Sequence, residues 1–171
     1  MKRLFFALWP DEQTRAEIDA LNQSIEQPGR RLVPENLHMT LVFLGNVDDA
    51  TADALRREAA DIQGRPIRLQ FDELDFWQRP RVLCLTCRRQ PKPLYTLVNA
   101  LSRMVEAYPV SLVERRHYRA HITLARKAQK RPRIKFQPIN FCADHFVLVE
   151  SVSTGQGVKY QVLEKWPLRL N

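Results

Sequence analysis

Apolar residues recur along the chain with two spacings, one typical of strands and one typical of helices. Short apolar runs bounded by proline, glycine or charged residues predict strands at residues 3–9, 37–44, 67–76, 81–88, 120–125, 141–151 and 158–166. Apolar residues three or four positions apart predict three helices, because that spacing places side chains on one face of a helix. The first helix begins at Pro10-Asp11-Glu12, the second follows Asp48-Asp49, and the third carries the apolar stripe from Leu94 to Val105.

Two segments of the chain share one order of elements and one short motif. In the first, a strand at Arg3–Leu8 and a helix precede Leu37-His38-Met39-Thr40-Leu41. In the second, a strand at Arg81–Thr86 and a helix precede Ala120-His121-Ile122-Thr123-Leu124. Duplicated units usually pack about a pseudo-twofold axis, so that equivalent strands face each other across a cleft. The repeat therefore predicts that the two histidines meet in that cleft.

Each motif places a polar pair on one face of its strand. Side chains alternate between the two faces of a strand, so His38 lies beside Thr40, and His121 lies beside Thr123. The opposite faces are apolar and carry Leu37, Met39, Leu41 and Phe43 in one strand, and Ala120, Ile122 and Leu124 in the other. Shuffling this composition yields two such motifs in under about one chain in a thousand. The polar pairs therefore point to chemistry rather than to packing alone.

Two facing imidazoles suit the hydrolysis of a phosphate ester. A neutral imidazole accepts a proton from the attacking water, and a protonated one donates a proton to the leaving alkoxide; a pKa of about 6.5 allows histidine both roles. The threonine hydroxyls can donate hydrogen bonds to the phosphate oxygens, and Arg126 or Arg119 can bind the same oxygens through two N–H groups. Strict alternation places Arg126 on the face opposite His121, so the strand must end, twist or bulge for Arg126 to reach the cleft.

The net charge of the chain indicates the kind of partner that it binds. Lys and Arg total 27 against 19 Asp and Glu, a net charge of +8 that favours a polyanion such as RNA. A basic run follows the second motif and contains Arg126, Lys127, Lys130, Arg131, Arg133 and Lys135. This run is either a solvated loop or the wall of a groove that follows the RNA backbone. No apolar stretch approaches bilayer length, and the N-terminal apolar run is too short for a signal peptide, so we expect a cytoplasmic protein.

Other reactive side chains have simpler interpretations. Cys84 and Cys87 have the CxxC spacing, but positions three apart on a strand point to opposite faces, which favours small strand residues over a redox or metal pair. His117 and His121 are about 13 Å apart on a strand, too far to share one metal ion, and we expect His117 and His145 at the surface or in turns. Four aromatic residues either stack on bases or belong to the core and its rim: Tyr118, Phe6, Trp77 and Trp166.

These motifs resemble those of the two-histidine phosphoesterases, and most closely the bacterial RNA 2',3'-cyclic phosphodiesterases, also called 2'-5' RNA ligases. The segments that carry the resemblance are Asn36–Leu41, Phe43–Gly45, Ala120–Arg126, Arg3–Leu8, Arg81–Leu83, Lys159-Tyr160 and Trp166. The resemblance covers nearly the whole chain. Ala120 departs from it, because many relatives have proline there.

The resemblance implies an α+β fold in which residues 1–171 form one two-lobed domain, with antiparallel sheets lining a central cleft and helices outside. It implies hydrolysis of a 2',3'-cyclic phosphate to a 2'-phosphomonoester without a metal ion or other cofactor, run in reverse by some members as 2'-5' ligation. His38 would be the proton donor and His121 the proton acceptor. Thr40, Thr123 and Arg126 would hold the phosphate.

The expected partners are RNA ends that carry a 2',3'-cyclic phosphate, including tRNA fragments, and the expected state is a monomer with no membrane contact. Two alternatives remain open. One is an RNA-binding relative without activity, which two intact histidine–threonine pairs argue against. The other is a phosphodiesterase for a small cyclic nucleotide, and the basic run favours RNA over that substrate.

Overall fold

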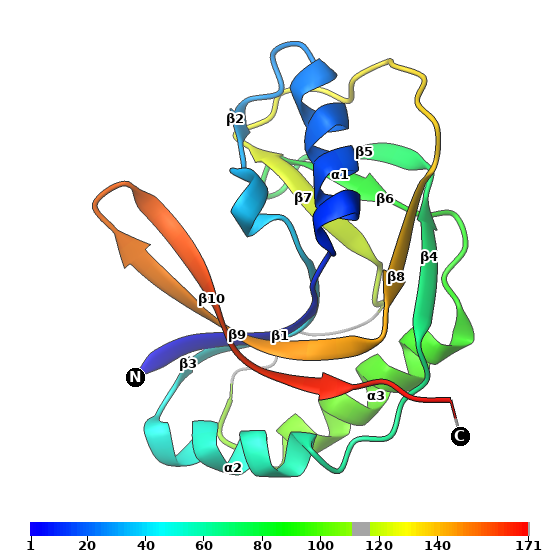
Figure 1. The fold of residues 1–171 in the computed structure, drawn as a ribbon. Coiled ribbons are helices and arrows are strands. Elements are labelled where there is room, and N and C mark those ends of the chain that lie inside the picture. Colours follow the sequence, from blue (N-terminus) through cyan, green and yellow to red (C-terminus); the bar gives the residue numbers. More distant parts are fainter. Residues whose placement is uncertain (111–116, 171) are drawn as a thin grey trace.

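The computed structural model describes residues 1–110 and 117–170, and its strands form three antiparallel sheets, giving the predicted α+β fold (Figure 1). The first sheet has the order β10 (Gly157–Pro167), β9 (His145–Thr154), β1 (Lys2–Leu8) and β3 (Met39–Val47). The second sheet has the order β2 (Arg30–Arg31), β7 (His121–Arg126), β6 (Val82–Thr86) and β5 (Glu73–Trp77). A two-stranded sheet pairs β4 (Ile67–Phe71) with β8 (Ile139–Ala143).

The helices begin where the sequence predicts. They are α1 (Glu12–Ser24), α2 (Asp49–Ala59) and α3 (Lys92–Glu106), with a short 3-10 turn, η1, at Pro34–Asn36. The Asp11 carboxylate accepts a hydrogen bond from the backbone N–H of Thr14, and the Asp48 carboxylate accepts one from Thr51, both at 2.7 Å. These caps satisfy N–H groups that have no partner inside the helix. None of the helices in the described ranges has both the length and the apolar character needed to cross a membrane.

Each repeat packs its helix on the sheet of the other repeat. Helix α1 follows β1 but lies over the second sheet, where the Asn22 side chain donates a buried 3.0 Å hydrogen bond to the Leu124 carbonyl of β7. Helix α3 connects β6 to β7 but lies beneath the first sheet, against α2 and β3 (Figure 1). The apolar stripe of α3 and the inward faces of both sheets belong to one continuous hydrophobic core. The two repeats are therefore interlocked.

Two of the predicted strands are each divided at an aspartate. The run 67–76 becomes β4 and β5, and the run 141–151 becomes β8 and β9, with Asp72 and Asp144 at the breaks. The Asp72 carboxylate accepts a hydrogen bond from the backbone N–H of Arg88, and the Asp72 N–H donates one to the Thr86 carbonyl of β6 at 3.1 Å, so the residue at this break is already held by the second sheet. The chain uses these breaks to pass from the two-stranded sheet into each of the larger sheets.

Both motif strands contain a β-bulge directly after their threonine. Thr40 pairs with Ala7 but Val42 pairs with Phe6, which leaves Leu41 as the extra residue in β3. In β7, Leu124 is the extra residue between its paired neighbours Thr123 and Ala125. A bulge shifts the alternation of side chains by one position. The strict alternation assumed from the sequence is therefore wrong beyond each threonine.

The bulges bring one more residue of each strand onto the face of the histidines. In β3 this residue is Phe43, which the alternation had assigned to the opposite face and which packs against a small apolar cluster that includes Phe5. In β7 it is Arg126, the residue five positions after the histidine in the second repeat, as Phe43 is in the first. The sequence alone left the direction of Arg126 open, and the bulge at Leu124 supplies the required change of face.

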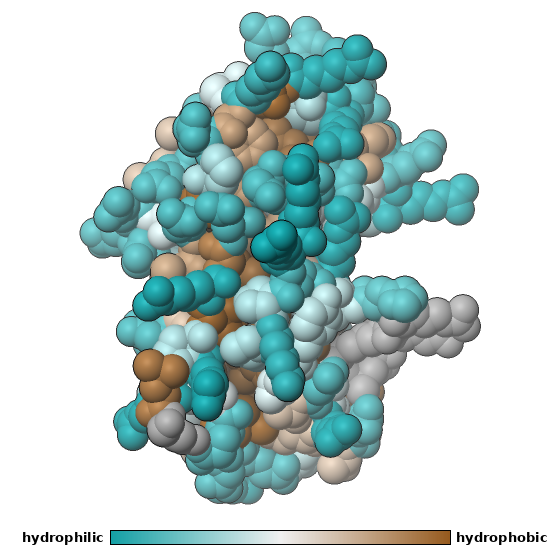
Figure 2. Space-filling model, turned by 90° about the vertical axis from the view of Figure 1, so that its right-hand side faces the viewer, coloured by the Kyte–Doolittle hydropathy of each residue, from teal (hydrophilic) through white to brown (hydrophobic). Residues whose placement is uncertain are grey.

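The surface around this core is mostly hydrophilic on the side of the two-stranded sheet. Figure 2 shows the side of the two-stranded sheet, where hydrophilic side chains cover most of the face and apolar ones appear in a band along its middle. Two aromatic residues considered as base-stacking candidates, Phe6 and Trp166, are buried in the core and contact each other with ring centroids 6.0 Å apart. They are therefore core residues.

Replacing Asn22 by alanine should destabilise the fold by about 0.5–1.5 kcal/mol, because the Leu124 carbonyl loses one of two buried hydrogen bonds at the bulge and keeps the one from the Leu32 N–H. The matched control is Gln23→Ala, one position along the same helix, where the exposed side chain makes only a 3.4 Å bond to Asp19. Urea denaturation measures both changes, and the control should stay within about 0.5 kcal/mol of the parent. Equal effects of the two substitutions would show that the Asn22 bond does not stabilise the bulge.

Candidate active site

The two motif histidines lie at equivalent positions of two strands that contact each other. His38 directly precedes β3 and His121 is the first residue of β7; both are half-buried. Across the same junction, the Tyr118 hydroxyl donates a 2.8 Å hydrogen bond to the Thr40 carbonyl. The positive charges of Arg126 and of protonated His121 both act on the pKa of His38. The structure thus brings the two histidines and Arg126 together in one site.

Both imidazoles are anchored through the same ring nitrogen. Nδ1 of His38 lies 2.7 Å from the carbonyl oxygen of Asn36, and Nδ1 of His121 lies 2.9 Å from that of Arg119. A carbonyl oxygen only accepts, so each Nδ1 carries the proton and donates it, which leaves Nε2 as the nitrogen available for proton transfer. Nε2 of His38 lies 3.0 Å from the Thr40 hydroxyl.

Aromatic rings enclose His38. Its ring lies 4.8 Å from Phe5, 5.7 Å from a stacked Trp9 and 4.9 Å from Tyr160, which approaches edge-on. Burial among these rings lowers the pKa of His38 to about 4, with smaller contributions from His121 and Arg126, while the Asn36 carbonyl opposes the shift. His38 is therefore neutral at pH 7 when the site is empty. Trp9 and Tyr160 had no role assigned at the sequence level.

His121 has more polar surroundings. The Trp77 ring lies 4.5 Å from the His121 ring, and the Arg119 guanidinium forms a 3.0 Å ion pair with Asp75 on β5. Burial lowers the pKa of His121, the positive charge of Arg119 lowers it further, and the hydrogen bond to the Arg119 carbonyl opposes both. Of the two arginines named from the sequence, Arg119 is thus engaged by a carboxylate.

Asn36 holds His38 and the projecting β9–β10 hairpin at once. Its backbone carbonyl accepts the Nδ1 proton of His38, while its side chain donates to the Val158 carbonyl at 2.8 Å and accepts from the Tyr160 N–H at 3.4 Å. The buried Asn36 amide therefore fixes the strand that carries one of the rings around His38. The residue stands in the first motif, but its long-range contacts leave no trace in the sequence pattern.

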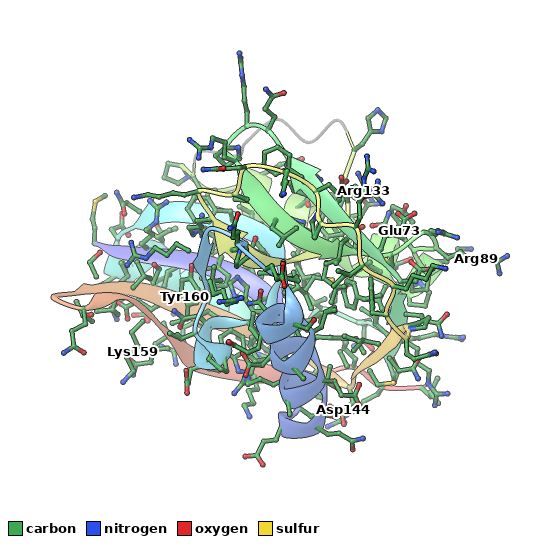
Figure 3. The ribbon with its side chains drawn as sticks, turned by 90° about the horizontal axis from the view of Figure 1, so that it is seen from above. Glu73, Arg89, Arg133, Asp144, Lys159 and Tyr160 are labelled. Carbon is green, nitrogen blue, oxygen red and sulfur yellow. The ribbon has the colours of Figure 1, made fainter. Side chains whose placement is uncertain are left out.

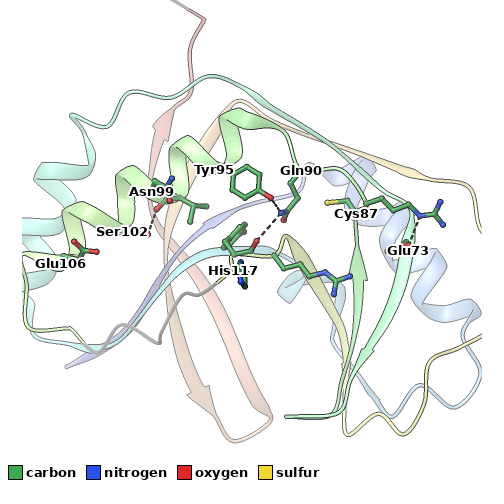
Figure 4. Close-up of a pocket in the computed structure, with 12 residues that line it drawn as sticks. Glu73, Cys87, Gln90, Tyr95, Asn99, Ser102, Glu106 and His117 are labelled. Atoms are coloured by element: carbon green, nitrogen blue, oxygen red, sulfur yellow. Dashed lines mark hydrogen bonds and ion pairs between the residues drawn. The ribbon is translucent and has the colours of Figure 1, made fainter.

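Gln90, which Figure 4 shows beside Tyr95, has the corresponding role for His121. Its side chain accepts a hydrogen bond from the Ala120 N–H and donates one to the Tyr118 carbonyl at 3.4 Å. These two bonds bracket Arg119, whose carbonyl anchors the His121 ring. The Gln90 side chain also bonds to the Tyr95 hydroxyl of α3 and borders a hollow of about 850 Å³. Sequence reasoning gave no indication of this residue.

The residues of the basic run lie in different parts of the structure. Its first residue, Arg126, is exposed at the end of β7 and acts on His38, whereas Arg131 and Lys135 line a separate hollow together with Glu73. Figure 3 shows Arg133 on the same side as Glu73, away from Tyr160. The interpretation of the whole run as one groove wall therefore stays a prediction.

The remaining candidates lie in ordinary environments. Cys84 pairs with Thr123 across β6 and β7, and burial raises its pKa to about 12; burial raises the pKa of Cys87 to about 11. His117 is exposed, and half-buried His145 contacts the neighbouring Asp144 carboxylate at 2.6 Å. Over residues 1–110 and 117–170, no group of three or more His, Cys, Asp or Glu side chains could hold a metal ion.

Comparison with known proteins places this site in a family. A family model described as LigT-like phosphoesterase matches residues 8–84. The RNA 2',3'-cyclic phosphodiesterase of Escherichia coli (strain K12) is 32% identical, with 98% of this chain and 97% of that protein covered; that of Aquifex aeolicus is 25% identical, with 92% and 88% covered. The crystal structure of E. coli LigT complexed with 3'-AMP superposes with a TM-score of 0.88 at 29% identity, covering 98% of both chains. The chain belongs to the LigT-like family of two-histidine phosphoesterases.

Proposed function

We propose that this chain hydrolyses 2',3'-cyclic phosphates at RNA ends to 2'-phosphomonoesters, without a metal ion, using His38 and His121 as its acid–base pair. The observation that carries the proposal is the pair of imidazoles on equivalent strands, each anchored at Nδ1 so that Nε2 is the nitrogen left for proton transfer, with Arg126 close by. The names of the relatives, RNA 2',3'-cyclic phosphodiesterases of similar length, support the same substrate.

In the proposed reaction, Nε2 of His121 accepts a proton from a water molecule whose oxygen attacks the phosphorus. The bond between phosphorus and the 3'-oxygen breaks, and Nε2 of protonated His38 gives its proton to that oxygen. The product carries the phosphate on the 2'-oxygen and a free 3'-hydroxyl. Thr40, Thr123 and Arg126 would hold the non-bridging oxygens, where negative charge resides in the transition state.

In this scheme, the negative charge of the substrate favours the protonated form of His38. The empty site keeps His38 neutral at pH 7, because burial holds its pKa at about 4. A cyclic phosphate brings one negative charge next to the imidazole, and a neighbouring opposite charge favours the protonated form. Binding therefore raises the pKa of His38 in the same step that places the leaving oxygen beside it.

We further propose that residues 1–171 act as one two-lobed catalytic domain and as a monomer, because the two sheets each supply one histidine. RNA ends with a cyclic phosphate, including those of tRNA fragments, are the proposed partners, and the net charge of +8 favours their capture. With a 5'-hydroxyl in place of water as the nucleophile, the same steps would open the cyclic phosphate to a 2'-5' linkage and a free 3'-hydroxyl.

The direct test is incubation with a short RNA that ends in a 2',3'-cyclic phosphate, in excess chelator, with identification of the product phosphate. The parent protein should give the 2'-phosphate, and His38→Ala and His121→Ala should each lose about 10²–10⁴-fold in kcat. His145→Ala is the matched control, because His145 lies away from the site beside Asp144, and it should keep full activity. Binding of the RNA without turnover would favour the non-catalytic alternative, and turnover of only a small cyclic nucleotide would favour the other.

The pH dependence offers an independent check. Activity requires neutral His121 and protonated His38, so its rate profile is bell-shaped, and the two limbs report the pair as a coupled unit. In the free enzyme the pKa of both histidines is lowered, so kcat/KM should already decline on its alkaline side below pH 6.5. The alkaline limb of kcat should lie at higher pH, because bound phosphate raises the pKa of His38. Coincident alkaline limbs would contradict substrate-assisted protonation of His38.

A further inference from the structure

One carboxylate on β5 connects two side chains that both contact His121. Oδ2 of Asp75 accepts a hydrogen bond from the indole N–H of Trp77 at 3.0 Å and forms the ion pair with the Arg119 guanidinium at 3.0 Å. Oδ1 of Asp75 accepts the backbone N–H of Phe76 at 2.9 Å, which fixes the direction of the carboxylate. The side chain of Asp75 is 25% exposed, and that of Arg119 is 48% exposed.

The two partners of Asp75 hold the His121 ring in different ways. The Trp77 ring lies against the imidazole with centroids 4.5 Å apart. The Arg119 backbone carbonyl accepts the Nδ1 proton of His121 at 2.9 Å, while the Arg119 guanidinium lies over the Trp77 ring, 6.0 Å from its centroid. One ring contact and one hydrogen bond therefore fix the imidazole, and both depend on groups that bind the same carboxylate oxygen.

The first repeat has no such carboxylate. Asp75 pairs with Cys84 in the second sheet, and Val147 pairs with Ala7 at the corresponding place in the first. Val147 is fully buried in the apolar cluster beside His38. The two histidines therefore differ at this position: an apolar side chain supports the surroundings of His38, whereas an ion pair supports those of His121.

We propose that Asp75 is a positioning residue of the active site, which acts through Trp77 and Arg119 to orient His121 and to compensate the charge of Arg119 beside it. This inference rests on the proposed function only for its kinetic readout. In this proposal, Arg119 forms an ion pair with Asp75 and helps to orient His121, the proposed base. Arg126, at the far end of β7, remains available to bind the phosphate.

The charges around His121 determine the direction in which each substitution shifts its pKa. The titratable groups on the elements around His121 are Glu73 and Asp75 on β5, Cys84 on β6, His38 before β3, and Arg119 and Arg126 on the β7 segment. The positive charge of Arg119 lowers the pKa of His121. Removing the Asp75 charge leaves Arg119 uncompensated, which lowers this pKa further, and removing the Arg119 charge raises it. Substitutions of the two members of one ion pair should therefore shift His121 in opposite directions.

The experiment compares Asp75→Asn and Arg119→Gln with the parent protein, and uses Glu164→Gln as the matched control. Glu164 lies on β10 of the first sheet and forms a 2.5 Å ion pair with Arg56 of α2. The kcat of Asp75→Asn should fall about 10- to 100-fold, as expected for a misplaced base, with KM unchanged or lower. In Asp75→Asn the limb of the kcat/KM profile that follows His121 should move to lower pH, in Arg119→Gln it should move to higher pH, and the control should match the parent.

A second measurement separates this proposal from the proposed function. Titration of the His121 ring by NMR in the RNA-free protein reports its pKa whether or not the protein turns over a cyclic phosphate. Trp77→Phe removes the N–H donor but leaves the Asp75–Arg119 pair, so it should lower kcat without moving the His121 midpoint. A His121 midpoint in Asp75→Asn equal to that of the parent, or displaced in the same direction in Asp75→Asn and Arg119→Gln, would overturn the proposal. A merely unfolded fraction would lower activity but leave the midpoint in place.

Discussion

The apolar faces of α1 and α3 must be buried, and each is buried on the sheet of the repeat that does not contain it. This exchange places one hydrophobic core behind both sheets, so neither sheet can move without disturbing packing on the other. The geometry between His38 and His121 is therefore set by the core. Two side-chain amides, Asn36 and Gln90, refine it by fixing the backbone carbonyls that anchor the two rings.

Much of the fold could be predicted from the sequence because its elements have strong local signals. The apolar stripe of α3, the start at Pro10-Asp11-Glu12 and the cap at Asp48 predict the helices, and the repeated motif predicts that equivalent strands face each other. The breaks at Asp72 and Asp144 were missed because apolar residues continue on both sides, and only pairing with different partners separates the strands. The exchange of helices is likewise a tertiary arrangement that periodicity does not encode.

In the candidate site, too, residues with local sequence signals could be predicted and residues placed by long-range contacts could not. His38, His121, Thr40 and Thr123 could be found because they recur in one motif, and motif spacing is local. The direction of Arg126 depended on a bulge at Leu124, which is stabilised by a hydrogen bond from Asn22, 102 positions away. Bonds between residues far apart in sequence leave no periodic signal, so only three-dimensional coordinates could connect such residues to the histidines.

The bulges have a consequence for the direction of the reaction. They bring Phe43 onto the face of the histidines in one repeat and Arg126 in the other, so positions related by the pseudo-twofold axis hold a phenyl ring and a guanidinium. A cleft with perfect twofold symmetry would accept a phosphate ester in two opposed senses, and one of every two encounters would present the wrong oxygen to the acid. On the β3 side the Arg3 guanidinium lies over the Phe43 ring, 4.7 Å from its centroid, whereas on the β7 side the Arg126 guanidinium takes the position itself. This asymmetry would give the site a polarity that orients a substrate anion before any proton moves.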